Sequence, residues 1–86
     1  MKPQSFLKAV GYRIRVIRTG KKLSQEKLAE MSNLHPTFIS NLENGKLNGS
    51  ILSFYRIAQA LDTPLPKLFV VKAPSVSPVN RSKKKS

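Results

Sequence analysis

The stretch from residue 24 to residue 46, SQEKLAEMSNLHPTFISNLENGK, constrains the fold more than any other part of the chain. Apolar residues recur in it at spacings of three and four, on both sides of a polar break at Ser32 and Asn33. This spacing predicts two short amphipathic helices joined by a tight turn. One face of the second helix then packs inward and the other is left free.

Local signals place the boundaries of these two helices. Ser24 is a favourable N-cap for a helix over residues 25–31, and Asn33 is expected in the left-handed conformation at the turn. The pair His35 and Pro36 opens the next helix, because proline at the first helical position loses no hydrogen bond. Asn44-Gly45 closes that helix.

The flanking sequence predicts further helices over residues 5–18 and 51–61, from apolar side chains at helical spacing. Gly20 is expected to end the first of them in a left-handed conformation. Thr63-Pro64 resembles the start of a short fifth helix ending near Phe69. The predicted fold is therefore all-α, a compact five-helix domain over residues 1–69, followed by a flexible, disordered basic tail over residues 70–86.

Charge and composition narrow the function. Sixteen Lys and Arg side chains face four Asp and Glu, a net charge of +12, and 11 basic and 4 acidic groups lie in residues 1–69, which alone carry +7. Such a basic domain attracts polyanions. The chain has no cysteine and one histidine, which argues against a zinc site or a disulfide framework, and we expect no cofactor. No grouping of nucleophile, acid and base supports an enzyme.

The free face of the helix after the turn is rich in small hydrogen-bonding groups. Apolar Phe38, Ile39 and Leu42 point to one side. The other side carries Pro36, Thr37, Ser40, Asn41 and Asn44. Amides and hydroxyls on a slim helix can read base edges in the DNA major groove, and asparagine can pair with adenine through two hydrogen bonds. The alternative is an ordinary solvated helix face. The two-helix layout and the positive charge favour a DNA-binding helix-turn-helix.

The sequence resembles the phage-repressor/Cro type, or Xre-like, family of helix-turn-helix transcriptional regulators. The matching segments are Ser24-Gln25, Leu28-Ala29, Leu34, Phe38-Ile39-Ser40, residues 42–46 (LENGK), residues 57–61 (IAQAL) and Leu68-Phe69. Together they span about residues 5–69.

The resemblance implies roles for individual residues. Bases would be read by Pro36, Thr37, Ser40 and Asn41, although Pro36 lacks the polar side chain usual at its position. Gln25 would bind phosphate, and Asn44 and Lys46 would hold the DNA backbone beside the recognition helix. By charge and position, Ser24, Arg15, Lys21 and Lys22 are further candidates for phosphate contact or positioning. His35 is expected to be a helix cap or a phosphate neighbour, with base reading as the alternative. Arg18 and Glu43 would form a structural salt bridge.

The predicted function is sequence-specific binding of double-stranded DNA by a transcriptional regulator. We expect a repressor that acts as a homodimer on a (pseudo)palindromic operator and could contact RNA polymerase. The expected dimer interface comprises Leu65, Leu68, Phe69, Val70 and Val71, unless Leu68 and Phe69 instead complete the monomer core.

Several alternatives stay open. The same domain type serves as an antitoxin, as a controller of restriction-modification systems, and as a protein-interaction coactivator. RNA binding rests on charge alone, because the helix face lacks exposed aromatic platforms. No apolar run is long enough for a membrane span, and we expect a cytoplasmic bacterial or phage protein, associated with the nucleoid.

Overall fold

A computed structural model describes residues 2–71 of the chain. Within these residues the fold is all-helical, with no strands, as predicted. Four α-helices and one 3₁₀ helix follow in order: α1 (Pro3–Gly20), α2 (Gln25–Ser32), α3 (Pro36–Glu43), α4 (Ile51–Ala60) and η1 (Leu65–Phe69).

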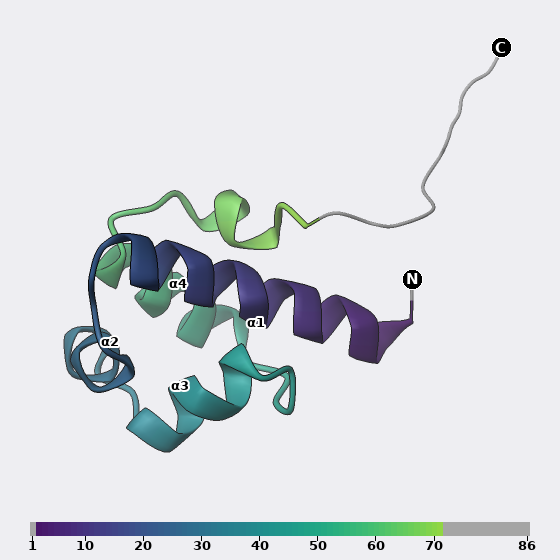
Figure 1. Cartoon of the computed structure of the whole chain (residues 1–86), viewed down its shortest axis with the longest axis horizontal. Helices are drawn as coiled ribbons and strands as arrows, with labels where there is room; N and C mark the ends of the chain where they lie inside the picture. Colours follow the sequence, from purple (N-terminus) through teal and green to yellow (C-terminus); the bar gives the residue numbers. More distant parts are fainter. Residues whose placement is uncertain (1, 72–86) are drawn as a thin grey trace, which may run out of the picture.

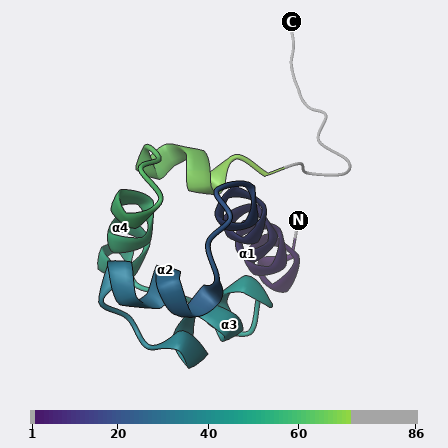
Figure 2. The same cartoon turned by 60° about the vertical axis from the view of Figure 1, so that its left-hand side comes forward.

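The helices surround one core (Figures 1 and 2). Figure 2 shows α4 opposite α1, with η1 bridging them on one side and α2 and α3 closing the other. Accordingly, α1 contacts α3 and η1, while α4 contacts α2 and η1. The core side chains are almost completely buried: Val10, Ile14, Leu28, Ile39, Leu42, Ile57, Leu61 and Leu68. The predicted inward faces therefore meet in a single cluster.

Serine caps start two of the helices. The Ser24 hydroxyl accepts a hydrogen bond from the backbone N–H of Lys27 at 2.9 Å, and Ser50 accepts one from Ser53 at 3.1 Å. Each bond satisfies a backbone donor that the first turn of a helix leaves without a partner. Pro36 is the first residue of α3, as predicted.

The end of α1 differs from the prediction. Gly20 is a helical residue, and the left-handed residue is Lys22, with φ of 60°. The N–H groups of Lys22 and Leu23 turn back to the carbonyls of Thr19 and Arg18 at 2.9 and 3.1 Å. This pattern places the left-handed residue just beyond the helix end, whichever side chain stands there. Asn33 does adopt the expected left-handed conformation, with φ of 58°.

The backbones of α1 and α3 approach each other closely at Gly11. A Cβ atom at this position would lie 2.3 Å from the carbonyl oxygen of Leu42 and 2.6 Å from that of Glu43. Glycine is the one residue that permits this approach. The contact sets the distance between α1 and the end of α3.

The predicted fifth helix is a 3₁₀ helix that begins at Leu65, one residue later than the proline expected to open it. In this helix the backbone N–H of Lys67 donates to the Pro64 carbonyl at 3.0 Å. Pro66 has no N–H and cannot add a further backbone hydrogen bond. Arg13 of α1 fastens the segment, because its Nε donates to the Lys67 carbonyl at 3.1 Å.

A flexible, disordered tail was predicted for residues 70–86. Only Val70 and Val71 of this tail lie within the described residues, and residues 72–86 lie outside them. No helix in the described part of the chain has the length and apolar character needed to cross a membrane.

Candidate DNA-binding surface

The outer face of α3 carries the four residues predicted to read bases. Pro36 and Thr37, in its first turn, are exposed, and Ser40 and Asn41 are half-buried one turn later. The opposite side of the helix is anchored in the core by Ile39 and Leu42. The face is thus held on a rigid support and offers two hydroxyls and one amide for hydrogen bonding.

An open hollow of about 500 Å³ separates the start of α2 from α3. Ser24 and Gln25 line it from α2, and Pro36, Thr37 and Ser40 line it from α3. The structure therefore brings the predicted positioning residues of α2 next to the predicted base-reading residues.

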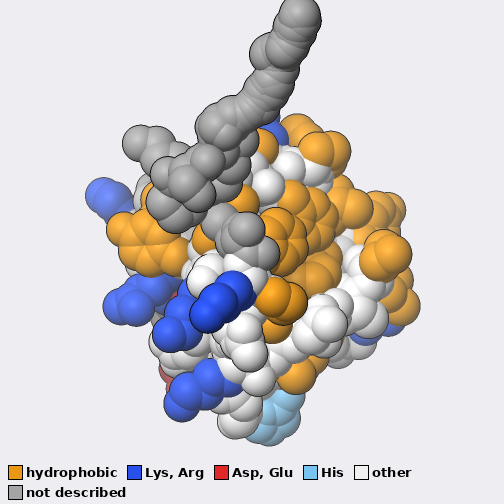
Figure 3. All heavy atoms as spheres, turned by 90° about the vertical axis from the view of Figure 1, so that its right-hand side faces the viewer, with side chains coloured by type: hydrophobic (Ala, Val, Ile, Leu, Met, Phe, Trp, Pro, Cys, Tyr) orange, Lys and Arg blue, Asp and Glu red, His pale blue; other side chains and the backbone are white. Residues whose placement is uncertain are grey.

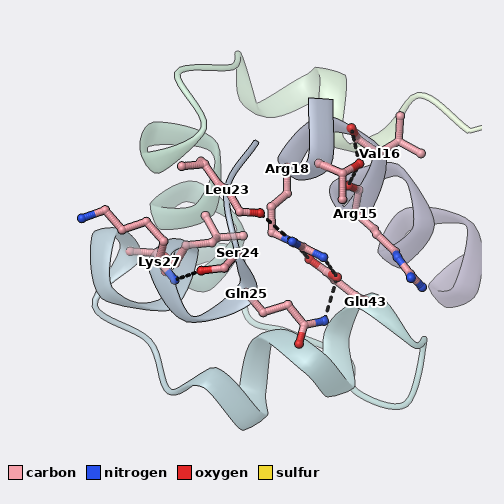
Figure 4. Close-up of polar contacts among 11 residues, drawn as sticks. Arg15, Val16, Arg18, Leu23, Ser24, Gln25, Lys27 and Glu43 are labelled. Atoms are coloured by element: carbon pink, nitrogen blue, oxygen red, sulfur yellow. Dashed lines mark hydrogen bonds and ion pairs between the residues drawn. The ribbon is translucent and has the colours of Figure 1, made fainter. Parts of the chain in front are cut away.

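The Arg18–Glu43 ion pair is present beneath this surface (Figure 4). Arg18 Nε donates to Glu43 Oε2 at 2.6 Å, and Nη2 donates to Oε1 at 3.0 Å. The two side chains are only 9% and 1% exposed, respectively. Such two-point pairing is strong and directional. It also neutralises the carboxylate at the end of α3, which would otherwise repel phosphate.

The same guanidinium joins a third segment. Arg18 Nη1 donates to the carbonyl of Leu23 at 2.7 Å, in the loop that leads into α2. One side chain on α1 therefore fixes both the loop before α2 and the end of α3 (Figure 4).

Gln25 makes a contact that the sequence did not indicate. Its Nε2 donates to Glu43 Oε1 at 3.0 Å, and the side chain is half-buried (Figure 4). No spacing rule connects these positions, because 18 residues separate them and the contact depends on how α2 and α3 cross. Only one of the two amide hydrogens of Gln25 is used, so its predicted role at phosphate is compatible with this bond.

His35 caps α3. Its Nδ1 accepts a hydrogen bond from the backbone N–H of Thr37 at 3.1 Å, and the ring is exposed. This local role accompanies the positioning role expected from the sequence.

The remaining positioning candidates are four exposed cations and one exposed amide. Arg15 lies on α1, Lys21 and Lys22 follow it, and Asn44 and Lys46 follow α3. Backbone bonds from Gly45 and Lys46 to carbonyls of α3 hold the last of these segments in place. Among residues 2–71, no three His, Asp or Glu side chains are grouped closely enough to bind a metal.

The predicted dimer interface needs one correction. Leu68 is 0% exposed and belongs to the monomer core, so it has no surface left for a partner. Phe69 packs edge-on against Phe54, with ring centroids 5.2 Å apart, and remains partly exposed. Leu65 and Val71 are half-buried against the core, and Val70 is 61% exposed.

Exposed apolar side chains of α4 were missed in the sequence analysis. Ile51 is 82% exposed, and Leu52 and Tyr55 are exposed as well. Figure 3 shows a broad group of hydrophobic side chains over one side of the face it presents, and Lys and Arg over the other side beside a smaller hydrophobic group. Leu52 and Tyr55 fall outside the helical spacing of the buried residues of α4, so their exposure could have been predicted. Ile51 has the spacing of the buried residues and was expected with them, but it is the first residue of the helix and is exposed.

These features define a helix-turn-helix protein: two short helices, a left-handed turn residue, and a second helix with a free polar face. A family model described as helix-turn-helix, HTH_3, matches residues 14–68. The chain belongs to this family, whose members are DNA-binding transcriptional regulators, and the Xre/Cro resemblance is confirmed.

Individual relatives are also regulators by name. The chain is 42% identical over 55 residues to control protein C.SmaI of Serratia marcescens, covering 64% of this chain and 66% of that protein. It is 38% identical over 52 residues to the immunity repressor protein of Bacillus phage phi105, covering 60% of this chain and 36% of the repressor. The chain thus spans just under two thirds of the first relative's length and about a third of the second's.

A solved structure shares the fold. The restriction-modification controller protein C.AhdI from Aeromonas hydrophila aligns with a TM-score of 0.75 and 38% identity. The alignment covers 76% of this chain and 98% of C.AhdI.

Proposed function

We propose that this chain binds double-stranded DNA sequence-specifically as a homodimer and regulates transcription, most simply as a repressor. In this proposal α3 enters the major groove, and regulation follows from occupying an operator or from contact with RNA polymerase beside it. The protein would act in the cytoplasm of a bacterium or phage host, on nucleoid DNA. The observation that carries the proposal is the free polar face of α3, held by a buried ion pair and set in a basic domain.

The dimer follows from the size of the module. One such domain covers only about 600–1,000 Å² on DNA, which gives limited specificity. Exposed Val70, Phe69 and the outer residues of α4 offer apolar surface for a second copy. Two-fold pairing would place the two α3 helices about one turn of DNA apart, on an inverted repeat.

A more specific candidate is the controller of a restriction-modification system. C.SmaI is a control protein, and C.AhdI is a restriction-modification controller. The phage immunity repressor among the relatives supports the simple repressor instead. Genes for an endonuclease and a methyltransferase beside this one would favour the controller.

Selection from a random duplex library at about 150 mM salt tests the proposal. We expect an inverted repeat in the bound pool, because specific contacts persist when salt screens phosphate attraction. Recovery of no motif, with binding lost as salt rises, would refute specific readout and favour the protein-partner alternative.

Two substitutions separate base reading from phosphate contact. Asn41→Ala is expected to weaken operator binding by about 1–3 kcal/mol and relax preference at one base pair. Lys46→Ala is expected to weaken binding to all duplexes alike and to lower the salt slope by about one. Titrations on operator and scrambled duplex over a salt series measure both effects. Identical profiles for the two variants would contradict the assigned roles.

The dimer surface is tested by Val70→Lys. Because Val70 is largely exposed, we expect the helical circular dichroism spectrum to be retained, a monomer in sedimentation, and weaker operator binding. Met31→Lys on α2, also an exposed apolar position, is the matched control and should leave the dimer intact. A dimer that survives Val70→Lys would move the interface away from this residue.

A further inference from the structure

The N-cap of α3 is an unusual residue. Ser, Thr, Asp and Asn are preferred at this position because a short side-chain oxygen reaches the backbone of the first turn. Here His35 performs the capping, with Nδ1 accepting from the N–H of Thr37 at 3.1 Å. An imidazole also carries a second ring nitrogen, which the short caps lack.

The capping bond determines which nitrogen carries the proton. Nδ1 can accept a hydrogen bond only through its lone pair, so in the capping state the single proton of the neutral ring is on Nε2. The capping atom faces the helix, and the ring is exposed, so the Nε2–H group is a donor on the outer side. Figure 3 shows this histidine, the single one in the chain, at the edge of the molecule.

The position of this donor complements its neighbour. Pro36, next in sequence and exposed, has neither a backbone N–H nor a polar side chain. The N–H of Thr37 is already used by the cap, so neither of the first two residues of α3 offers a free backbone donor. His35 thus supplies a neutral donor at the end of the helix that we place in the groove.

We propose that His35 is a two-ended positioning residue: Nδ1 caps α3, and Nε2–H donates to a hydrogen-bond acceptor of the DNA duplex. The inference rests on the proposed function. The acceptor is a phosphate oxygen or an acceptor on a base edge, such as guanine N7 or thymine O4. A donor-only group cannot pair with the amino groups of adenine or cytosine. Its contact therefore selects acceptors.

The tautomer can be measured without DNA. Long-range ¹H–¹⁵N spectra of the free protein at about pH 8 report which ring nitrogen is protonated. The single histidine makes the assignment unambiguous. We expect the Nε2–H form; a ring protonated on Nδ1 would overturn the proposal.

His35→Ser separates the two ends, because serine retains a capping oxygen next to the backbone, while its short O–H does not extend outward as the ring Nε2–H does. We expect an unchanged melting temperature and roughly three- to tenfold weaker operator binding, the loss of one neutral hydrogen bond. His35→Ala removes the cap too and should lower both stability and affinity. An affinity for His35→Ser equal to that of the unmodified chain would show that His35 is a cap only and overturn the proposal.

A phosphate acceptor and a base-edge acceptor predict different losses of affinity for His35→Ser on operator and scrambled duplexes. An equal loss on operator and scrambled duplex identifies phosphate, and a loss on the operator alone identifies a base edge. Failure of the proposed function is recognised separately: a chain that selects no duplex refutes both ideas. Selective binding that His35→Ser leaves intact refutes only this one.

Discussion

Replacing Gly11 with alanine is expected to destabilise the domain by about 3 kcal/mol. The new Cβ would sit 2.3 and 2.6 Å from the carbonyl oxygens of Leu42 and Glu43. These are backbone atoms at the end of α3, and they cannot rotate away as a flexible side chain would. Relief requires α1 and α3 to separate, which loosens the core around Ile14 and Ile39. For so small a domain this is a large share of the total stability.

Thermal and denaturant unfolding followed by circular dichroism measure the effect. Gly20→Ala is the matched control, because no heavy atom lies within 4 Å of the Cβ it would add. Since Gly20 is helical, this control should be neutral or stabilising by up to about 1 kcal/mol. Similar unfolding midpoints for the two variants would argue against the close approach of α1 and α3.

Removing the carboxylate with Glu43→Ala is the second large change, with an expected loss of about 2–4 kcal/mol. Arg18 would remain as a buried charge without its partner, and Gln25 would lose its acceptor. The cost arises mainly from stranding these groups rather than from the attraction itself. Urea unfolding at constant salt measures the loss.

Two comparisons test this explanation. Glu30→Ala breaks the exposed Lys27–Glu30 pair, whose atoms are 3.4 Å apart, and should cost no more than about 0.5 kcal/mol. The double variant Arg18→Met with Glu43→Leu removes both charges and should recover part of the stability lost in Glu43→Ala. A melting temperature unaffected by Glu43→Ala would refute the structural role of the pair.

Much of the fold follows from local sequence. Helical spacing of apolar residues located the four α-helices, and Ser24 and Pro36 marked the starts of α2 and α3, because capping depends on a few adjacent residues. Helix ends were less predictable. Glycine adopts the left-handed conformation most easily, so Gly20 was expected to do so. Instead Lys22 is left-handed, because the N–H groups of Lys22 and Leu23 bond back to the carbonyls of Thr19 and Arg18.

The candidate site also combines features that the sequence indicated with features that only the packed structure reveals. The outer face of α3 was visible in its sequence, and the Arg18–Glu43 pair was implied by family resemblance. The Gln25–Glu43 bond was not indicated by the sequence, and the burial of Leu68 was only the alternative to a dimer contact, since both depend on how distant segments pack. The capping role of His35 was one of two local roles open to it, and the structure supplies the bond.

The set of hydrogen bonds made by Arg18 has an evolutionary consequence. The bonds from Arg18 to Glu43 and Leu23 lie behind the helix-turn-helix, and none involves the outward-facing side chains of Pro36, Thr37 or Asn41. Residues that set the orientation of α3 are thus different from those that face outward. Under the proposed function, operator preference can therefore change, by evolution or by grafting, through outward-facing positions of one helix while the scaffold keeps its stability.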